Sequence, residues 1–437
     1  MNIVGNQQRS FLRLLAGLRP HWRRDRNLAA RIQTLLARNR SFGSRDRRLY
    51  RELIYTTLRY RSWIEPHLDS GPDFAVQVAA WLSTDSPATA NFRAALLADW
   101  PPCPPTVAEK FAVLSVRHGW GPAKTRPASP PLPAWFRSHC PEAFESPNLE
   151  TLLARAPLWL RLQADATAAR VTDEFSRLGW PFEFSAILPS ALRLLDEVDV
   201  TKTSAYRTGL IEVQDLGSQL VLESTGIAPG GRWLDACAGA GGKTLQLARL
   251  LGSSGHVDAH DIRPAALREL ALRATRAGLR LGPASSPRVP KAPPDNCHIM
   301  YDNCSATVAL LDRPPDSDYD GVLVDAPCTG SGTWRRAPHL MWTTTESDIA
   351  AAAETQLSLL VSFAARVRPG GRLIYATCSL SRRENEDVVA AFLAAQPAFR
   401  SEAPARTFGS TVRGGGLTFL PARNDTDGFF VASLRKT

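Results

Sequence analysis

The N-terminal part of the chain carries hydrophobic residues at helical spacing. Three apolar stripes run through residues 11–18, 28–36 and 49–58, each with a repeat of three or four positions. That repeat places the apolar side chains on one face of a helix. Arginines flank the third stripe, which indicates an amphipathic helix with a basic outer face. Further helices are expected at 74–82, 91–97 and 107–116.

The middle of the chain is expected to hold a linker and a small α+β unit. Residues 120–134 are rich in proline and predict a linker or an extended surface strap, which we bound at 126–156. Short apolar runs after it are typical of strands. The strands are expected at 158–162, 182–184, 191–194 and 210–213, with a helix at 166–178.

From about residue 230 short apolar strands alternate with longer helices. This alternation predicts a doubly wound α/β domain with a mostly parallel sheet. Strands are expected at 232–236, 256–261, 297–301, 321–325, 372–377, 417–420 and 429–434, and helices at 243–250, 264–277, 347–367 and 384–394. The segment 282–296 has five prolines and no periodicity, so we expect a loop there.

Composition narrows the class of protein. The chain has 437 residues, of which 44% are hydrophobic and 22% charged, and these fractions exclude wholesale disorder or a collagen-like fibre. We expect no membrane span and no secretory signal, because no long apolar run occurs. Seven cysteines are too few and odd in number for a disulfide framework, so reduced thiols and a cytoplasmic location are expected.

Positive charge is concentrated at the N-terminus. Residues 1–65 contain 15 Arg, no Lys and 4 acids, which gives +11, whereas the whole chain carries +10. A basic block on a nearly neutral body indicates a polyanionic partner, most simply a nucleic acid. A solvated basic helix face, or a general preference for Arg over Lys, would give the same count.

A glycine-rich turn follows the first strand of the α/β domain. It reads Asp235-Ala-Cys-Ala-Gly-Ala-Gly-Gly-Lys-Thr244. A P-loop needs glycine at Cys237, and a dinucleotide fingerprint needs glycine or alanine at Thr244, so neither motif fits. Asp261, after the next strand, is placed to accept hydrogen bonds from ribose hydroxyls, and Asp302 is expected to face an adenine edge. The pattern favours a nucleoside cofactor without a diphosphate, such as S-adenosylmethionine, over NAD or ATP. On this turn alone, an ordinary tight turn between strand and helix is a serious alternative. The expected cofactor-binding residues are Ala236, Cys237, Ala238, Gly239, Ala240, Gly241, Gly242, Lys243, Asp261, Arg263, Asp302 and Asp325.

Two cysteines follow neighbouring strands of the predicted sheet. Cys328 lies in the sequence Asp325-Ala-Pro-Cys-Thr-Gly, and Cys378 in Thr-Cys-Ser after the strand at 372–377. A lone cysteine is usually a small core residue. Two at strand ends beside a cofactor turn indicate chemistry instead. A zinc site is disfavoured because no Cys-x-x-Cys spacing or paired histidines occur, so we expect no metal.

Two thiols and an acid beside a methyl donor suit methylation of cytosine. Carbon 5 of that ring is a poor nucleophile until a thiolate adds to carbon 6, and an acid bonded to N3 offsets the charge that develops. The second thiol can then help the first to leave. Spacing alone does not decide which cysteine attacks.

At these residues the chain resembles the Sun (RsmB-type) family of RNA cytosine-5 methyltransferases. Five segments carry the resemblance: 213–219, 235–244, 325–338, 368–386 and 427–430. The resemblance implies a Rossmann-like class I S-adenosylmethionine-dependent fold. It also implies that Cys378 is the nucleophile, that Cys328 assists product release, and that Asp325 and Lys243 contact the cytosine. DNA cytosine methyltransferases use the Pro-Cys thiol as nucleophile instead, so this assignment depends on the resemblance.

The resemblance also supplies a domain plan and a substrate. Residues 44–67 resemble a NusB-like helical RNA-binding domain, and 157–215 an RNA-recognition insertion. We therefore expect a NusB-like domain at 1–125, the linker at 126–156, the α+β unit at 157–220 and the catalytic domain at 221–437. RNA is the expected partner, with ribosomal RNA favoured and transfer RNA as the alternative. A non-catalytic assembly factor would not need Asp325, Cys328 and Cys378, and a protein or small-molecule methyltransferase would not need paired thiols.

Overall fold

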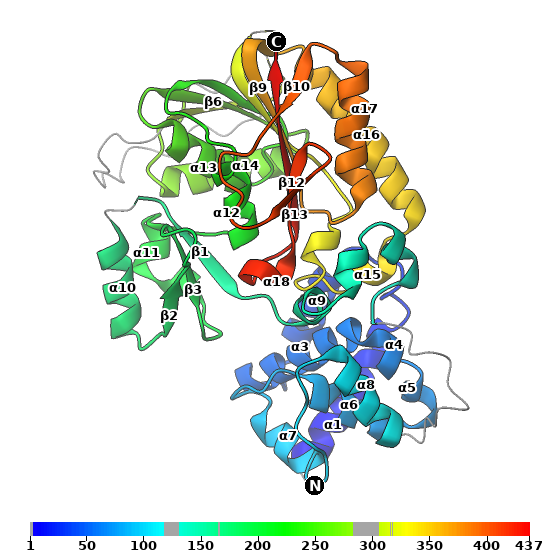
Figure 1. The fold of residues 1–437 in the computed structure, drawn as a ribbon. Coiled ribbons are helices and arrows are strands. Elements are labelled where there is room, and N and C mark those ends of the chain that lie inside the picture. Colours follow the sequence, from blue (N-terminus) through cyan, green and yellow to red (C-terminus); the bar gives the residue numbers. More distant parts are fainter. Residues whose placement is uncertain (1–2, 118–130, 165–166, 283–305, 315, 317) are drawn as a thin grey trace. The chain divides into compact units, whose positions relative to one another are not determined.

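The chain folds into two units whose boundary departs from sequence order. The computed structural model describes residues 3–117, 131–164, 167–282, 306–314, 316 and 318–437 (Figure 1). The first unit comprises Met1–Arg155 together with Thr333–Glu346, and the second comprises Ala156–Gly332 together with Ser347–Thr437. A short segment of the predicted catalytic domain thus belongs to the N-terminal unit.

The first unit is helical, as the apolar spacing predicts. Phe11, Leu28 and Leu53 are fully buried, one on each of the first three long helices. The helices are α1 (Ile3–Leu18), α2 (Leu28–Arg38), α3 (Ser44–Arg59), α4 (Arg61–Ile64), α5 (His67–Ser70), α6 (Pro72–Leu82), α7 (Ala90–Leu96) and α8 (Val107–Arg117).

The basic outer face predicted for α3 is only partly correct. Arg48 and Arg51 are exposed, but Arg59 and Arg61 are buried at 4% and 8% exposure. Arg59 donates a hydrogen bond to the carbonyl oxygen of Arg335 (3.2 Å), and Arg61 pairs with Glu65 (3.1 Å). These two guanidinium groups serve the packing of the unit, so the charge available to a partner is smaller than the sequence count.

Residues 134–153, predicted as part of a linker, are folded instead. They form η1 (Ala134–Ser138), η2 (Pro141–Phe144) and α9 (Asn148–Leu153). Phe136 and Leu152 are fully buried, so apolar anchors between the prolines fix this stretch to the first unit. Residues 118–130, which include the start of the predicted linker, lie outside the described residues.

The segment 333–346 packs within the first unit and contains α15 (Leu340–Thr343). Trp334 is fully buried, with its ring 4.5 Å from that of Phe136. The indole nitrogen of Trp342 donates to the carbonyl oxygen of Leu58 (2.7 Å). This segment begins directly after the loop that carries Cys328, so it ties that loop by covalent connection to the helical unit.

The second unit begins with a small antiparallel sheet of order β2-β3-β1-β4. Val171 and Phe175 of α10 are buried against Leu160, Leu192 and Ile211 of its strands. The prediction of a small α+β unit is confirmed by these elements. They are β1 (Leu158–Leu162), α10 (Ala168–Arg177), β2 (Phe182–Phe184), β3 (Ala191–Leu194), η4 (Val200–Lys202), α11 (Ser204–Arg207) and β4 (Ile211–Val213).

A large sheet of order β11-β12-β13-β9-β8-β5-β6-β7 forms the rest of this unit, with β10 beside β13. The pairs among β5–β9 are parallel, and those of the later strands are antiparallel. The strands are β5 (Gly231–Asp235), β6 (Gly255–His260), β7 (Thr307–Leu311), β8 (Tyr319–Asp325), β9 (Val367–Thr377), β10 (Phe399–Glu402), β11 (Thr411–Arg413), β12 (Gly416–Phe419) and β13 (Phe429–Lys436). The predicted α/β class with a parallel core is confirmed.

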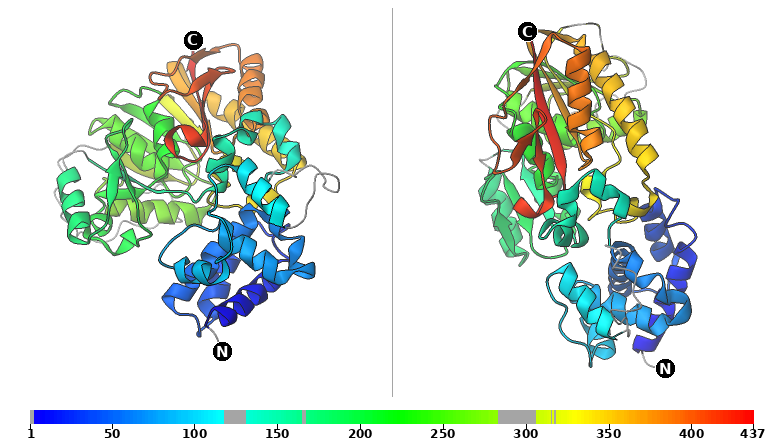
Figure 2. Two further views of the ribbon diagram at one scale, coloured as in Figure 1. Left: turned by 60° about the horizontal axis from the view of Figure 1, so that its bottom comes forward. Right: turned by 45° about the vertical axis from the view of Figure 1, so that its right-hand side comes forward.

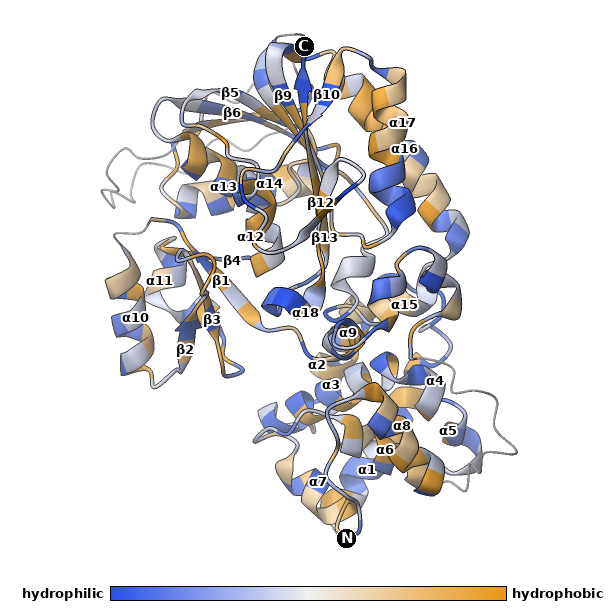
Figure 3. Cartoon of the chain, in the orientation of Figure 1, coloured by the Kyte–Doolittle hydropathy of each residue, from blue (hydrophilic) through white to orange (hydrophobic). Residues whose placement is uncertain are grey.

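Helices cover both faces of this sheet (Figures 1 and 2). Trp233 and Leu234, neighbours on β5, belong to two different core clusters, because successive strand residues face opposite sides. One cluster contains residues of α12, α13 and α14, and the other contains residues of α16 and α17. Figure 3 shows the central strands as mostly hydrophobic, as strands buried on both faces should be. The helices are α12 (Leu216–Glu223), α13 (Gly242–Leu251), α14 (Pro264–Arg276), α16 (Glu346–Ala364), α17 (Glu386–Ala395) and α18 (Pro421–Asn424).

The third parallel strand differs from the prediction. The strand expected at 297–301 and Asp302 lie outside the described residues, whereas the strand that pairs with β6 is β7, at Thr307–Leu311. Strands β10 and β11 were not predicted. In the part of the chain that the structure describes, no helix has the length and apolar character needed to cross a membrane.

Candidate functional site

The predicted site residues gather at the carboxyl edge of the parallel sheet. Asp235 ends β5, Asp261 follows β6, Asp325 ends β8 and Cys378 follows β9. Parallel strands end at the same edge, so these four side chains come from one border of the sheet. That border is where open α/β sheets bind ligands.

The glycine turn leaves room for a ligand at its backbone. Gly239 and Gly241 have φ of +54° and +91°, a region that side chains other than glycine rarely adopt. A Cβ built on Gly242 would meet nothing within 4 Å, and one on Gly239 would meet only the guanidinium of Arg263 at 3.7 Å. The N-terminus of α13 starts here, and its N–H groups favour an electron-rich partner. The turn therefore fits a nucleoside cofactor that approaches the backbone closely.

Three hydrogen bonds hold the glycine turn against its neighbours. The amide N–H of Ala238 donates to the carbonyl oxygen of His260 (2.8 Å), and that of Ala236 donates to Leu323 (2.8 Å). The carbonyl oxygen of Ala240 accepts a hydrogen bond from Arg273 of α14 (2.8 Å). The turn is thus fixed to β6, β8 and α14 before any ligand binds.

Asp261 is saturated by hydrogen bonds from the protein. It accepts from the amide of Gly239 (2.9 Å), from the amide of Arg263 (2.9 Å) and from the Arg263 guanidinium (2.9 and 3.0 Å). Burial raises the pKa of Asp261, but the bonds from Arg263 and Gly239 outweigh it and leave that pKa below its usual value. The side chain of Arg263 is 68% exposed, so solvent surrounds most of it.

Two further residues at this edge of the sheet were not predicted from the sequence. Ile262 is 88% exposed, although it lies directly beside Asp261. Asp312 follows β7 immediately, which is the position that had been predicted for Asp302. The apolar run Thr307–Leu311 before an acid was the signal that could have identified Asp312. An exposed aliphatic side chain and a carboxylate here suit the flat face and the polar edge of an adenine ring.

The two predicted cysteines meet. Their sulfur atoms lie 3.3 Å apart, Cys328 in the loop after β8 and Cys378 in the turn after β9. The hydrogen bond with Cys378 and burial raise the pKa of Cys328 well above its usual range. Either sulfur can donate the hydrogen bond between them, and the raised pKa favours the thiol form of Cys328.

Lys243 and Asp325 form an ion pair beside the thiols. The ammonium nitrogen of Lys243 lies 2.8 Å from Oδ2 of Asp325. Burial lowers the pKa of Lys243, but the negative charges of Asp325, Cys378 and Asp235 outweigh it and leave that pKa above its usual value. A buried ammonium group thus pairs with the acid, and the charge of Cys378 also acts on it.

The third cysteine of the region is unsuited to attack. Burial, and then the carboxylates of Asp235, Asp325 and Asp261, raise the pKa of Cys237 to about 12. Burial also raises the pKa of Asp235 to about 7, while its Oδ2 accepts a hydrogen bond from the hydroxyl of Thr244 (2.7 Å). Asp235 and Cys237 therefore shape the turn rather than react.

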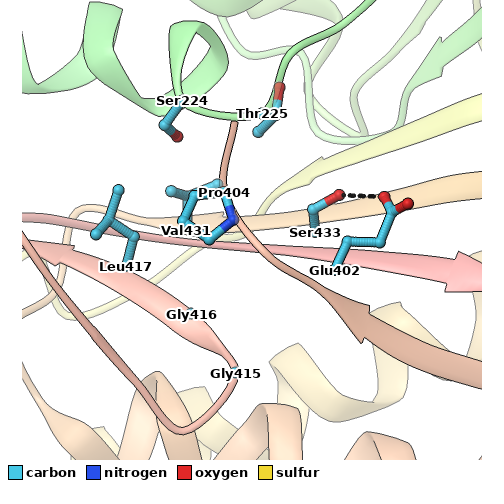
Figure 4. Close-up of a pocket in the computed structure, with 9 residues that line it drawn as sticks. All are labelled: Ser224, Thr225, Glu402, Pro404, Gly415, Gly416, Leu417, Val431 and Ser433. Atoms are coloured by element: carbon cyan, nitrogen blue, oxygen red, sulfur yellow. Dashed lines mark hydrogen bonds between the residues drawn. The ribbon is translucent and has the colours of Figure 1, made fainter. Parts of the chain in front are cut away.

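A separate open pocket of about 230 Å³ lies away from these residues (Figure 4). Ser224 and Thr225, Gly415, and residues of β10, β12 and β13 line it. Its one acid, Glu402, already accepts hydrogen bonds from Arg372 (2.8 Å) and Ser433 (3.1 Å) and also pairs with Arg435, so this pocket offers no free chemistry. Within the residues that the structure describes, no group of three or more His, Cys, Asp or Glu side chains could hold a metal ion.

The chain is similar to known methyltransferases in sequence and in fold. The sequence profile of the family described as 16S rRNA methyltransferase RsmB/F matches residues 225–435. A probable ribosomal RNA small subunit methyltransferase B from Synechocystis is 31% identical over 320 residues, which cover 70% of this chain and 67% of that protein. The fold is also shared with a solved methyltransferase homolog from Pyrococcus horikoshii (TM-score 0.53, 23% identity, 68% of this chain and 91% of that chain).

A probable methyltransferase of the same name from Bacillus subtilis is 32% identical over 282 residues. The match covers 63% of this chain and 58% of the Bacillus protein, so it spans less than two thirds of that relative's length. The resemblance found in the motifs is confirmed: the chain belongs to the RsmB/F family of S-adenosylmethionine-dependent rRNA methyltransferases.

Proposed function

We propose that this chain methylates carbon 5 of a cytosine in small-subunit ribosomal RNA, with S-adenosylmethionine as methyl donor. The observation that carries the proposal is the pair of sulfur atoms of Cys328 and Cys378, 3.3 Å apart. The ion pair between Lys243 and Asp325 beside them supplies the acid that the reaction needs. The names of the relatives support ribosomal RNA as substrate.

The residues that would hold the cofactor are those of the glycine turn and the neighbouring strand ends. The turn at 236–243 would accept the amino-acid part, Asp261 the ribose hydroxyls, and Ile262 with Asp312 the adenine. Asp312 takes the role first expected of Asp302. Arg263 would release Asp261 rather than bind the cofactor itself. The cofactor supplies an electrophilic methyl group at this edge of the sheet.

Cys378 acts as the nucleophile. Its thiolate adds to carbon 6 of the cytosine, and the electron pair of the double bond between carbons 5 and 6 moves into the ring. The ion pair of Lys243 and Asp325 delivers a proton to N3, which offsets the developing negative charge. Carbon 5 then has the electron density of an enamine and can accept a methyl group.

Cys328 acts when the product leaves. The proton on carbon 5 passes to solvent, the double bond re-forms, and the bond between carbon 6 and the sulfur of Cys378 breaks. The thiol of Cys328 stabilises the departing thiolate by a hydrogen bond, because its raised pKa keeps its own proton in place. The proton on N3 returns to the pair of Lys243 and Asp325, and Cys378 is again a thiolate.

RNA binding falls to the exposed arginines of the first unit and to the small α+β unit. Arg48 and Arg51 lie on the exposed side of α3 and can contact phosphates without reading sequence. The base must be unpaired or extruded to reach the thiols, at a cost of a few kcal/mol. Transfer RNA remains the second candidate substrate, since a thiol pair handles cytosine in any RNA.

Two variants test the proposal on total RNA from a strain that lacks the gene. Cys378→Ala should abolish methylation, which bisulfite sequencing detects. Cys328→Ala should accumulate a protein–RNA adduct that survives denaturant, because the methylated base cannot leave Cys378. Full methylation by Cys378→Ala would move the nucleophile elsewhere, and absence of any methylated cytosine with the wild-type protein would refute the proposed function.

A further inference from the structure

A buried carboxylate lies directly behind the two thiols. Glu384 ends η6 (Arg382–Glu384), before α17, and is fully buried. Of the ion pairs in the described part of the chain, none involves Glu384, so no cation compensates its charge directly. Burying a carboxylate is costly unless hydrogen bonds satisfy it. The donors that do so are therefore informative.

Four hydrogen bonds reach the carboxylate. Oε1 accepts from the amide of Thr329 (2.8 Å) and from the side chain of Gln356 in α16 (3.2 Å). Oε2 accepts from the hydroxyl of Thr329 (2.5 Å) and from the hydroxyl of Ser379 (2.6 Å). Three of the four donors thus belong to only two residues.

Those two residues are the neighbours of the thiols. Thr329 follows Cys328, and Ser379 follows Cys378, so one carboxylate joins the loop after β8 to the turn after β9. Gln356 reinforces the first loop, since its amide also donates to the carbonyl oxygen of Pro327 (3.0 Å). The two thiols come from separate strands and approach each other only if these loops keep their relative position.

We propose that Glu384 is a positioning residue that sets the distance between the thiols of Cys328 and Cys378. The effect that we expect on product release rests on the proposed function, whereas the effect of Glu384 on the distance between the thiols does not. Without Glu384 the residue next to Cys328 loses its bridge to the turn of Cys378, although the amide of Gly332 still donates to the carbonyl oxygen of Cys378 (2.9 Å) and Ser331 still bonds to Ser379 (3.0 Å). The thiol of Cys328 is then no longer held against the sulfur that must leave.

Glu384→Gln tests this with little change in volume. The amide offers one oxygen and one NH₂ group in place of two acceptor oxygens, so an NH₂ group would face the hydroxyls of Thr329 and Ser379. Both hydroxyls must then turn, and the two strong hydrogen bonds to a charged oxygen that join the loops are lost. Glu354→Gln is the matched control, because Glu354 is exposed on α16 and loses the same charge.

The first measurement is the rate of disulfide formation with diamide, without RNA. Each thiol loses a proton and an electron to form the Cys328–Cys378 disulfide, and the N=N bond of diamide takes up both protons and both electrons to become a hydrazine. Mass spectrometry of the joined peptides gives the rate. We expect Glu384→Gln to react at least tenfold more slowly than wild type, and Glu354→Gln to match wild type.

Circular dichroism and calorimetric binding of S-adenosylmethionine show whether the variants are folded. If Glu384→Gln does not fold, Thr329→Val decides, because it removes one hydroxyl donor and keeps the shape of the side chain. We expect a severalfold slower disulfide rate for Thr329→Val. A rate equal to wild type in the folded variant overturns the proposal.

The second measurement is the protein–RNA adduct. Folded Glu384→Gln should accumulate it as Cys328→Ala does, while the first methyl transfer proceeds. A loss purely of stability would lower adduct and methylation together and would overturn the proposal. If the wild-type protein does not methylate RNA, the proposed function fails, but the diamide comparison still tests the distance between the thiols.

Discussion

Gly241 gives a quantitative test of the cofactor turn. It precedes the first residue of α13 with φ of +91°, in the left-handed region. A Cβ added there would lie 2.7 Å from Cγ of Leu270, a fully buried residue of α14. Gly241→Ala therefore meets both a backbone penalty and a steric one.

The two costs have known sizes. The left-handed conformation costs a residue with a side chain about 1–2 kcal/mol. An extra methyl group in a packed interior costs about 1–3 kcal/mol, because Leu270 must shift. Together they predict that Gly241→Ala lowers the free energy of unfolding by about 2–5 kcal/mol.

Gly242→Ala, one residue later, separates stability from binding. A Cβ on Gly242 meets nothing within 4 Å, and alanine in a helix is favoured over glycine by up to about 1 kcal/mol. Stability should stay equal or rise. The new methyl group would occupy the space where the cofactor approaches, so affinity for S-adenosylmethionine should fall about tenfold, or about 1.4 kcal/mol.

Urea unfolding followed by circular dichroism compares the stabilities, and isothermal titration calorimetry gives the affinities. A Gly241→Ala midpoint equal to that of wild type would show that the left-handed turn is wrong. Unchanged affinity of Gly242→Ala would show that the cofactor does not approach this side of the turn.

Two further predictions concern charge. Burial raises the pKa of Asp235 to about 7, so this carboxyl keeps its proton to a higher pH in the folded state than in the unfolded state. The protonated group therefore stabilises the fold fully below about pH 4, and this contribution is lost as the pH rises to about 7. The total loss is on the order of 4 kcal/mol. Asp235→Asn should remove that fall in pH-dependent urea midpoints, and an unchanged profile would place the titration elsewhere. Exposed Arg48 and Arg51 are expected to contact phosphates, so changing both to Gln should reduce the slope of log affinity for RNA against log salt by about 1.5 without loss of stability. Arg31→Gln, whose guanidinium already pairs with Asp25, is the control, and equal slopes in both variants would exclude α3 as the RNA contact.

The sequence predicted which residues lie at the carboxyl edge of the sheet better than it predicted which side chains are buried or exposed. Asp325, Cys328 and Cys378 could be brought together in advance, because parallel strands end at one border whatever their side chains do. Ile262 could not, since an isoleucine after a strand is ordinarily a core residue, and only the structure shows it exposed.

Features that depend on tertiary partners were missed for a common reason. Arg59 and Arg61 continue the basic pattern of α3, and nothing local distinguishes them from exposed Arg48. Both contact the segment 333–346, which is distant in sequence but packs in the same unit: Arg59 bonds to the carbonyl oxygen of Arg335, and Arg61 lies over the ring of Trp342. Helical spacing of hydrophobic residues predicts which face of a helix is buried in its own core. It does not predict which polar residues a segment distant in sequence will cover.

The roles of the two thiols show what the structure adds to the motifs. From spacing alone either cysteine could attack. The surroundings are unequal, however, because the carboxylate of Glu384 contributes to the raised pKa of Cys328, while the charge of Cys378 contributes to the raised pKa of Lys243. An anion beside a sulfur atom favours its thiol form, which is the form expected of Cys328. These surroundings support the proposed roles, attack by Cys378 and release by Cys328, which the resemblance implies.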